Sequence, residues 1–503
     1  MFEIERCSKL NAQNNTNYLF EKSYFCSCFL NQIMSQSRKI IKNFVWLSIA
    51  EFATKGISFF NNAYLARVIL ADGYGKINFA IATVSYFVTF VTLGLNVVGA
   101  REVARNPESK VFFVNSIISI RLLLSFFAFV GYFGFIWINN FSDSQTLILI
   151  IASLYILSSV FTIDWYYQGI EKMEVLAIRQ FLIATLNFIG IVAFVHTPDD
   201  VVIAIVVMAC STLLNTLLIL IPYFHKTRLF AFNFNFTQLI PIVKDAVPVS
   251  LSQLLLVFLS SSSIILIGIL LPLAETKLGI YTAANKLMVL LFLPITVIQI
   301  VFYPYFSKAD ELQERQKAYE KYITLNIIIG VFLATFFFLF AENAIELVYG
   351  NNYTDSIILL KLMMLIVMMS YISQTAIHPL IAWKKEKQVL KIIFLAAIIN
   401  LILNAILLLK LDVIGAVWAN IVTEIFLMLS FIIIIRKNIQ QYPFILIGKI
   451  LLIGLLSAFL AHQVLILTNS IWISIITSLI TYFFIILVVK IITIEEIKGY
   501  LKR

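Results

Sequence analysis

The sequence predicts an all-α polytopic membrane protein of about fourteen transmembrane helices, on two main observations. Of the 503 residues, 61% are hydrophobic and only 13% are charged, whereas about a quarter of a soluble chain is charged. The apolar runs repeatedly reach the roughly 20 residues that a helix needs to cross about 30 Å of hydrocarbon, and they lack the polar–apolar alternation of a porin strand. The runs cover residues 43–69, 76–100, 111–138, 145–168, 176–196, 200–224, 243–271, 279–303, 321–342, 355–383, 389–409, 413–435, 444–466 and 470–492.

The distribution of Lys and Arg among the connecting loops supports this number of spans. Every second loop is basic, from the first, with Arg38, through the loop counted with Lys172 and Arg179, to the last, with Arg503. The alternate loops hold only Lys76, Lys277 and Lys410. Because cytoplasmic loops collect basic residues, both termini are predicted to face the cytoplasm. The net charge of +10 is explained in the same way, so nucleic acid is not an expected partner.

An internal repeat divides the chain. NNFSDS at 139–144 recurs as NNYTDS at 351–356, and LADGYGKINFA at 70–80 resembles LAETKLGIYTA at 273–283. Asn187 and Asn400 lie a similar distance apart. Six spans is an even number, so the halves are expected to be parallel repeats that form two lobes around a central cavity, with two extra C-terminal helices. The predicted parts are residues 1–33, a disordered or artefactual N-terminal extension; 34–224, an N-lobe; 243–435, a C-lobe; and 444–492, an extra helix pair.

Ionisable residues within the spans are candidates for function, because each one is costly in a bilayer. Glu51, Lys55, Ser58 and Asn62 share one face of the first span. This stripe faces either a hydrated cavity or a neighbouring helix, where Glu51 and Lys55 would pair only to specify packing. The predicted substrate-binding cations are Lys55, Arg67, Arg121, Lys286 and Lys361, and the predicted ion-coupling acids are Glu51, Asp164 and Glu424.

Other polar residues of the spans have simpler interpretations. Asp164 lies next to Trp165, Tyr166 and Tyr167, which are predicted to form an aromatic belt at the membrane interface. Asn400 and Asn404 share a helix face, as do Asn420 and Glu424, and the amides are expected to form hydrogen bonds between helices.

The excess of embedded cations over acids favours an anionic substrate. No G-x-x-x-x-G-K-[ST] motif is present, which argues against ATP hydrolysis by this chain. The sequence predicts no cofactor and no metal site, because the lone C-x-C of Cys26 and Cys28 has no second ligand pair. The longest outer loop is predicted at 342–354, which is small for a glycan-processing enzyme.

Several stretches resemble the polysaccharide transport family, which comprises the Wzx-type flippases of O-antigen and other repeat units and is related to the multidrug/oligosaccharidyl-lipid/polysaccharide exporters. The likeness runs from about residue 38 to the C-terminus. The stretches are YLARVILADGYGKINFA with LGLNVVGAREVARNP, WYYQGIEKMEVLAIRQ, GIYTAANKLMVLL, ELVYGNNYTDS and LDVIGAVWANIVTEI.

The resemblance implies a non-enzymatic flippase of the bacterial cytoplasmic membrane. Its substrate would be an undecaprenyl-pyrophosphate-linked oligosaccharide, moved by alternating access and coupled to H⁺ or Na⁺. Membrane lipids, and the polymerase and chain-length regulator of the same pathway, are the implied partners. The alternatives are a related transporter of a peptidoglycan lipid precursor or a small organic substrate, a membrane glycan polymerase, and a structural scaffold.

Overall fold

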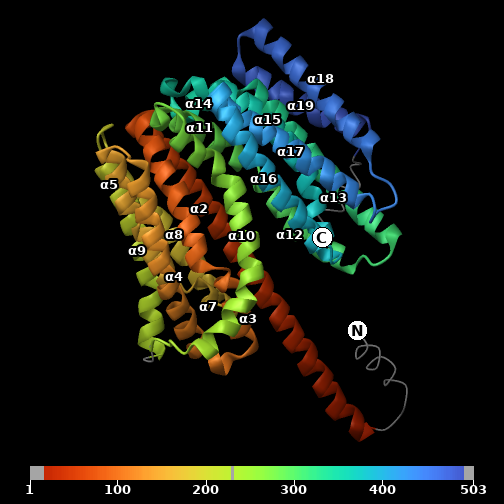
Figure 1. Cartoon of the computed structure of the whole chain (residues 1–503). Helices are drawn as coiled ribbons and strands as arrows, with labels where there is room; N and C mark the ends of the chain where they lie inside the picture. The colour runs from red at the N-terminus through yellow and green to blue at the C-terminus, as the bar shows by residue number, and fades with distance from the viewer. Residues whose placement is uncertain (1–15, 228–230, 492–503) are drawn as a thin grey trace.

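The computed structural model describes residues 16–227 and 231–491, and these ranges consist of helices joined by short turns (Figure 1). The first half comprises α2 (Thr16–Thr92), α3 (Leu95–Arg105), η2 (Pro107–Ser109), α4 (Lys110–Asn139), α5 (Asp143–Ala152), α6 (Leu154–Phe161), α7 (Asp164–Gly169), α8 (Met173–Phe194) and α9 (Val201–Thr227). The second half comprises α10 (Phe236–Leu270), α11 (Ala274–Leu290), α12 (Leu293–Lys308), α13 (Leu312–Leu339), α14 (Ala341–Tyr349), η3 (Asn351–Tyr353), α15 (Asp355–Ala382), α16 (Glu386–Leu411), α17 (Val413–Ile435), α18 (Phe444–Thr468) and α19 (Ile471–Val488).

The predicted all-α polytopic fold is confirmed, and each predicted span falls on a helix or a run of helices. Within the described residues, 13 helices are long and apolar enough to cross a membrane. The first of them, Phe52–Arg105, covers most of the first predicted span and all of the second. This merging accounts for the difference between 13 and about fourteen.

The chain reverses direction inside α2. Leu70 has φ 58° and ψ −178°, a backbone conformation that is not helical. The hydroxyl of Tyr74 donates to Oδ1 of Asn62 at 3.3 Å, although twelve residues of straight helix would separate the two by about 18 Å. Leu70 is therefore the turn between the first two spans.

Three predicted spans are interrupted instead of continuous. The second breaks between α2 and α3 at Gly94, whose φ is +62°. The fourth breaks at Thr162, whose ψ of 118° is extended and separates α6 from α7. The eighth breaks between α11 and α12, where Pro294 lies in the first turn of α12. A broken helix frees backbone carbonyls inside the membrane, and these need donors from elsewhere in the protein.

The helices form two groups (Figure 1). Helices α2 to α9 lie in one group and α11 to α17 in the other, while α10 runs between them and contacts α2, α3 and α4 as well as α11, α16 and α17. We call the end that carries 139–144 and α14 the outer end, following the predicted loop charges, and the opposite end the inner end. The two groups meet at the outer end and diverge toward the inner end (Figure 1).

The backbone repeats certain unusual conformations in the two groups. Leu70 and Leu273 have φ of 58° and 53°, and Glu171 and Lys384 have φ of 57° and 60°. Both pairs fall at the spacing of the sequence repeat. A positive φ is uncommon outside glycine, so its recurrence at matching turns supports a duplicated backbone.

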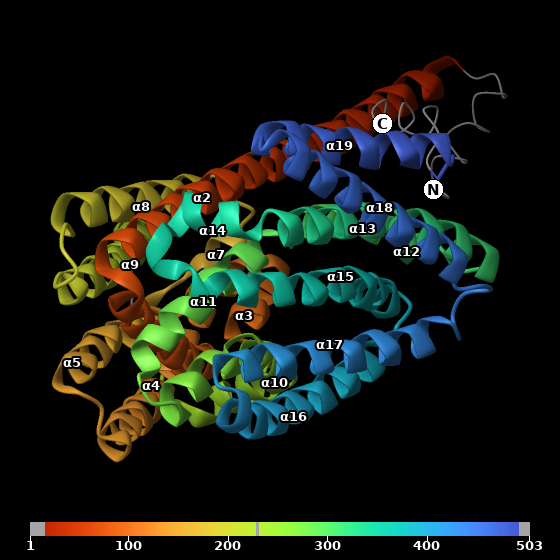
Figure 2. The same ribbon diagram turned by 90° about the horizontal axis from the view of Figure 1, so that it is seen from above.

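The extra helices α18 and α19 pack on each other, and α18 packs on α13 (Figure 2). Gly454 of α18 allows this approach, since a Cβ there would lie 2.4 Å from a methyl of Val331. Large apolar side chains such as Leu467 and Trp472 remain exposed at 80% and 76%. A continuous exposed apolar surface of this kind is suited to lipid.

The structure of two segments differs from the prediction. Helix α2 begins at Thr16, inside the extension predicted to end at residue 33, while residues 1–15 lie outside the described residues. The predicted outer loop 342–354 is mostly helical, because it contains α14 and η3.

Candidate functional site

Arg121 organises a charged cluster inside the first group of helices. Its side chain lies on α4 and is 0% exposed. Nη1 donates to the carbonyl oxygens of Ser159 at 3.2 Å and Thr162 at 2.7 Å, and Nη2 donates to Oδ1 of Asn96 at 2.5 Å. Both carbonyls lie at the C-terminal end of α6, where helical carbonyls have no partner and the dipole is negative. Arg121 therefore caps the break in the fourth span.

An ion pair lies on the other side of this break. Asp164 opens α7, and its Oδ2 is 2.6 Å from Nη2 of Arg179 on α8. Arg179 is 5% exposed, and its Nη1 also donates to the side chain of Asn215 on α9. Arg121, Asp164 and Arg179 thus contribute two buried cations and one acid. The N-lobe cluster, as we call these three residues with Asn96 and Asn215, joins five helices of the first group.

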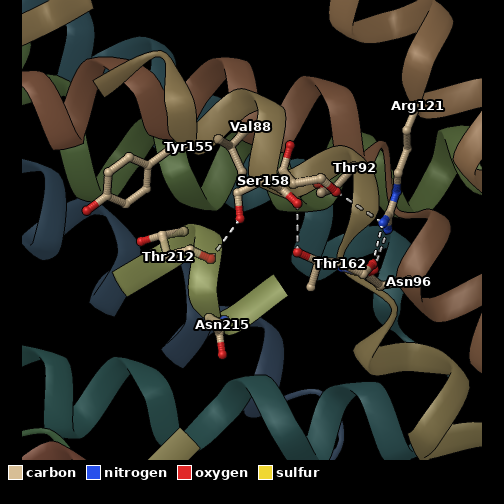
Figure 3. A pocket seen from close by; sticks show the side chains of 10 residues that line it. Val88, Thr92, Asn96, Arg121, Tyr155, Ser158, Thr162, Thr212 and Asn215 are labelled. Atoms are coloured by element: carbon tan, nitrogen blue, oxygen red, sulfur yellow. Dashed lines mark hydrogen bonds between the residues drawn. The ribbon is translucent and has the colours of Figure 1, made fainter. Parts of the chain in front are cut away.

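A cavity of about 200 Å³, lined mainly by residues that carry a polar group, adjoins the N-lobe cluster (Figure 3). Ser158 is central to its wall, with Oγ 2.6 Å from Oγ1 of Thr216 and donating to the carbonyl of Thr212 at 3.1 Å. The cavity's volume and hydroxyl lining suit a few waters or a small polar ligand. The lining residues are Val88, Thr92, Asn96, Arg121, Tyr155, Ser158, Ser159, Thr162, Thr212 and Asn215.

A second polar cluster, without any charge, lies in the other group. Asn400 of α16 donates to Oδ1 of Asn420 at 2.9 Å and to Oγ1 of Thr423 at 3.1 Å, both on α17. Ser262 of α10 donates to Oδ1 of Asn400 at 2.8 Å. Asn404 donates to the same oxygen at 3.0 Å. The C-lobe cluster, as we call these five residues, confirms the predicted interhelical hydrogen bonding of the amides.

Two predicted substrate-binding lysines have no partner within the described residues. Lys286 of α11 and Lys361 of α15 are half-buried and form no ion pair there. Because α11 begins at Ala274, five residues earlier than predicted, Lys286 lies about 18 Å along the helix from its outer end. That depth is close to the middle of the membrane, deeper than the sequence predicted.

Glu424 of α17 is a predicted ion-coupling acid that contacts one of these helices, α15. Its Oε1 accepts a hydrogen bond from Oγ of Ser373 on α15. Within the described ranges it forms no salt bridge. Glu424 is thus tied to a hydroxyl, whereas Asp164 is neutralised by an arginine.

The predicted polar stripe of the first span is only partly described. Lys55 is half-buried in α2, and Asn62 bonds to the carbonyl of Ser58 at 2.7 Å. The side chain of Glu51 lies outside the described residues. Arg67, further along α2, is exposed and contacts the backbone at the end of α14.

The prediction of an aromatic belt at the membrane interface after Asp164 was wrong. Trp165, Tyr166 and Tyr167 are 0%, 4% and 8% exposed and pack inside the first group. Trp165 fits because residue 99 is glycine, where a Cβ would lie 2.4 Å from the indole ring. These aromatic residues fill the core of the group instead of contacting lipid headgroups.

The sequence does not predict the partners of the candidate residues. Loop charge places Arg179 among the cytoplasmic cations, although this arginine lies six residues into α8. The position of Arg179 inside the predicted span 176–196 could have indicated that it lies within the membrane. Asn96 and Asn215 carried no signal of their own, because their roles depend on a break in the fourth span that hydropathy does not reveal.

Solved structures of membrane transporters share this fold. A structure of the lipid II flippase MurJ in an inward closed conformation covers 88% of this chain and 97% of its own at a TM-score of 0.71 and 17% identity. An inward-facing multidrug resistance MATE family transporter of the MOP superfamily covers 79% of this chain and 98% of its own at a TM-score of 0.60, also at 17% identity. At these identities the likeness concerns the fold.

Sequence comparisons point to polysaccharide synthesis. A protein of Escherichia coli (strain K12), described provisionally as an O-antigen transporter, is 21% identical over 409 residues, which cover 79% of this chain and 97% of the E. coli protein. Residues 40–310, more than half of the chain, match the model of the family described as polysaccharide biosynthesis protein. The chain is therefore a member of the polysaccharide biosynthesis protein family, with the polytopic helical fold of the MOP superfamily transporters.

Proposed function

We propose that this protein is a flippase of the cytoplasmic membrane that moves lipid-linked oligosaccharide repeat units from the inner to the outer leaflet for O-antigen or another surface polysaccharide. The carrier is undecaprenyl pyrophosphate, and the chain itself catalyses no covalent step. The family match, the provisional assignment of the E. coli relative and the likeness to a lipid II flippase support this proposal.

The observation that carries the proposal is the pair of unpartnered lysines. Lys286 and Lys361 lie in membrane helices and have no ion partner within the described residues. An ammonium group is costly to keep in a membrane without an anion, and a diphosphate headgroup would supply one. Arg67 and Arg121 are engaged by backbone carbonyls in this conformation, so we assign contact with substrate first to Lys286 and Lys361. Lys55 remains a further proposed contact.

We also propose that a cation gradient drives transport through Glu424. This carboxyl bonds to Ser373 and has no salt bridge within the described ranges, so H⁺ or Na⁺ can neutralise it without displacing a cation. Asp164 would have to separate from Arg179 first. Glu51 remains the third proposed acid.

A peptidoglycan lipid precursor is the second candidate substrate, because the lipid II flippase shares the fold over 88% of this chain. Both substrates carry a diphosphate between a polyprenyl tail and a sugar. The proposed lysine contacts would therefore serve either one, and only the glycan distinguishes the two candidates.

Reconstitution tests the proposal. The purified full chain is placed in proteoliposomes whose lipid carries either an undecaprenyl-pyrophosphate-linked oligosaccharide or lipid II, and a membrane-impermeant reagent modifies the sugar that reaches the outside. Transfer of the oligosaccharide, with lipid II left inside, is the expected result. Transfer of lipid II alone would favour the second candidate, and transfer of neither under an imposed proton or sodium gradient would contradict both.

Variants then test the lysines. Lys286→Ala is expected to abolish transfer, while Lys286→Arg retains part of it because the charge remains. Lys317→Ala, at an exposed position in the first turns of α13, is the matched control and is expected to transfer at the wild-type rate.

A further inference from the structure

Arg67 bonds to the end of a helix in the opposite group. Its Nε donates to the carbonyl of Val348 at 2.9 Å, and its Nη2 donates to those of Leu347 at 2.5 Å and Glu346 at 3.4 Å. These three residues are in the last turn of α14 (Ala341–Tyr349). The last carbonyls of a helix have no intrahelical partner and carry its negative pole. A guanidinium, with several donors in one plane, is suited to bind them together.

The neighbouring residue forms a second bond between the groups. The hydroxyl of Tyr353 donates to the carbonyl of Ala66 at 2.9 Å. The ring of Tyr74 contacts those of Tyr349 and Tyr353, each with 6.4 Å between centroids. All three tyrosines are buried. Two successive residues of α2, Ala66 and Arg67, thus form hydrogen bonds with the segment that follows α13.

Two glycines allow the helices beneath these bonds to touch. A Cβ on Gly75 would lie 1.8 Å from the carbonyl oxygen of Glu275, and a Cβ on Gly279 would lie 1.9 Å from that of Ala71. The contacts are reciprocal, because each glycine faces the backbone four residues before the other. Both pairs follow the sequence repeat, so α2 and α11 cross near the local two-fold axis of the molecule.

We call these contacts of Ala66, Arg67, Ala71 and Gly75 with α11, α14 and Tyr353 the outer junction. Apart from the contacts of α10, the principal contacts between the two groups are those of α2 with α11, α14 and η3. The groups diverge toward the inner end (Figure 1). A transporter that exposes its substrate to the outside has to separate the outer junction.

We propose that Arg67 is the latch of the outer junction: by capping α14 it holds the outer end closed, and its release accompanies opening to the outside. The inference rests on the proposed transport function, since only an alternating transporter needs to open this end. The glycines permit the close approach, and Arg67 stabilises it. Arg67 is exposed, so the helices can separate without leaving its charge buried.

Distance measurements between spin labels test the latch directly and need no substrate. The four cysteines are replaced by serine, and pairs of labelled cysteines are introduced at exposed positions. Ser144 and Lys410 report on the outer end, and Glu108 and Lys317 report on the inner end. Pulsed electron–electron double resonance in nanodiscs then gives the distance distribution of each pair.

Arg67→Ala removes the three hydrogen bonds to α14 and is expected to increase the ratio of outer-open to outer-closed molecules at least about tenfold, the effect of losing a single charge-assisted hydrogen bond. The outer pair then gains a longer distance, and the inner pair becomes shorter. Arg105→Ala removes an exposed arginine at the inner end and should leave both distributions unchanged. Tyr353→Phe should shift them in the same direction as Arg67→Ala, but less.

Unchanged distributions in Arg67→Ala would overturn the proposal, and so would an equal shift in Arg105→Ala. If the alanine variant does not fold, Arg67→Gln decides by the same two criteria. A shift of the distances in a protein that transfers no lipid-linked oligosaccharide would leave the latch standing and reject the proposed function.

Discussion

The two polar clusters differ in charge although the backbones around them are repeated. The N-lobe cluster contains the buried cations Arg121 and Arg179 and the acid Asp164, whereas the C-lobe cluster uses neutral amides and hydroxyls. Asn187 and Asn400 occupy equivalent positions in the repeat, yet only Asn400 is the centre of a cluster, and Oδ1 of Asn187 has no hydrogen-bond partner among the described residues. The repeat thus extends to the path of the chain and not to its polar chemistry.

This difference assigns different physical roles to the clusters. A neutral network satisfies its members locally, so it mainly fixes how α10, α16 and α17 pack. A buried ion pair is costly to separate, but a change of charge at either partner can rearrange it. We therefore expect the first group to be more sensitive to substitution and the second to be more tolerant.

The largest effect is expected for Arg179→Ala. Removing one partner leaves Asp164 largely buried without its counter-ion, which should lower the free energy of unfolding by about 3 kcal/mol, the lower end for buried pairs because Asp164 is 29% exposed. Thermal unfolding in detergent, followed by intrinsic fluorescence, measures the loss. The double variant Asp164→Leu/Arg179→Leu should recover most of it, and a single variant that unfolds at the wild-type temperature would contradict this account.

Arg121→Leu should cost about 2 kcal/mol, because it leaves the carbonyls of Ser159 and Thr162 without donors at the break between α6 and α7. The same unfolding assay applies. Arg121→Lys retains a charge and should lose less than the leucine variant. Equal losses in both variants would indicate that the shape of the guanidinium, and not its charge, supports the break.

In the C-lobe cluster, Asn400→Leu should cost about 1.5 kcal/mol, since Asn404, Asn420 and Thr423 lose a neutral partner and no charge is left unpaired. Thermal unfolding again measures the change. A loss larger than that of Arg179→Ala would reverse the contrast between the two groups.

The smallest effect is expected for Thr423→Val, about 0.6 kcal/mol, the typical value of one hydrogen bond between membrane helices. Ser262→Ala, which removes a second single hydrogen bond to Asn400, is its matched comparison. If either substitution abolished folding, the cluster would be more cooperative than its pairwise bonds indicate.

Hydropathy and loop charge were sufficient to predict the spans, because both depend on the bilayer and not on side-chain packing. They were insufficient for the breaks. The extended residue Thr162 inside the fourth span is stabilised by a contact with the distant Arg121, and no local pattern marks it. The predicted spans therefore have the right positions but not the right continuity.

The candidate residues were predicted by depth, and their partners were not. Lys286 and Glu424 lie within membrane helices as expected. The contact of Arg67 with α14 was beyond prediction because α14 itself was read as a loop, and a C-terminal cap requires the helix to be known first. Asp164 was considered alone because Arg179 was counted as a loop residue.

The most direct test of the central claim is to delete the gene in the organism that carries it and to measure surface polysaccharide together with lipid-linked repeat units. The account predicts loss of the surface polymer with single undecaprenyl-pyrophosphate-linked repeat units accumulated on the cytoplasmic side, restored by the wild-type gene and not by Lys286→Ala. Repeat units that still reach the outer leaflet but remain unpolymerised would contradict it and point to a polymerase.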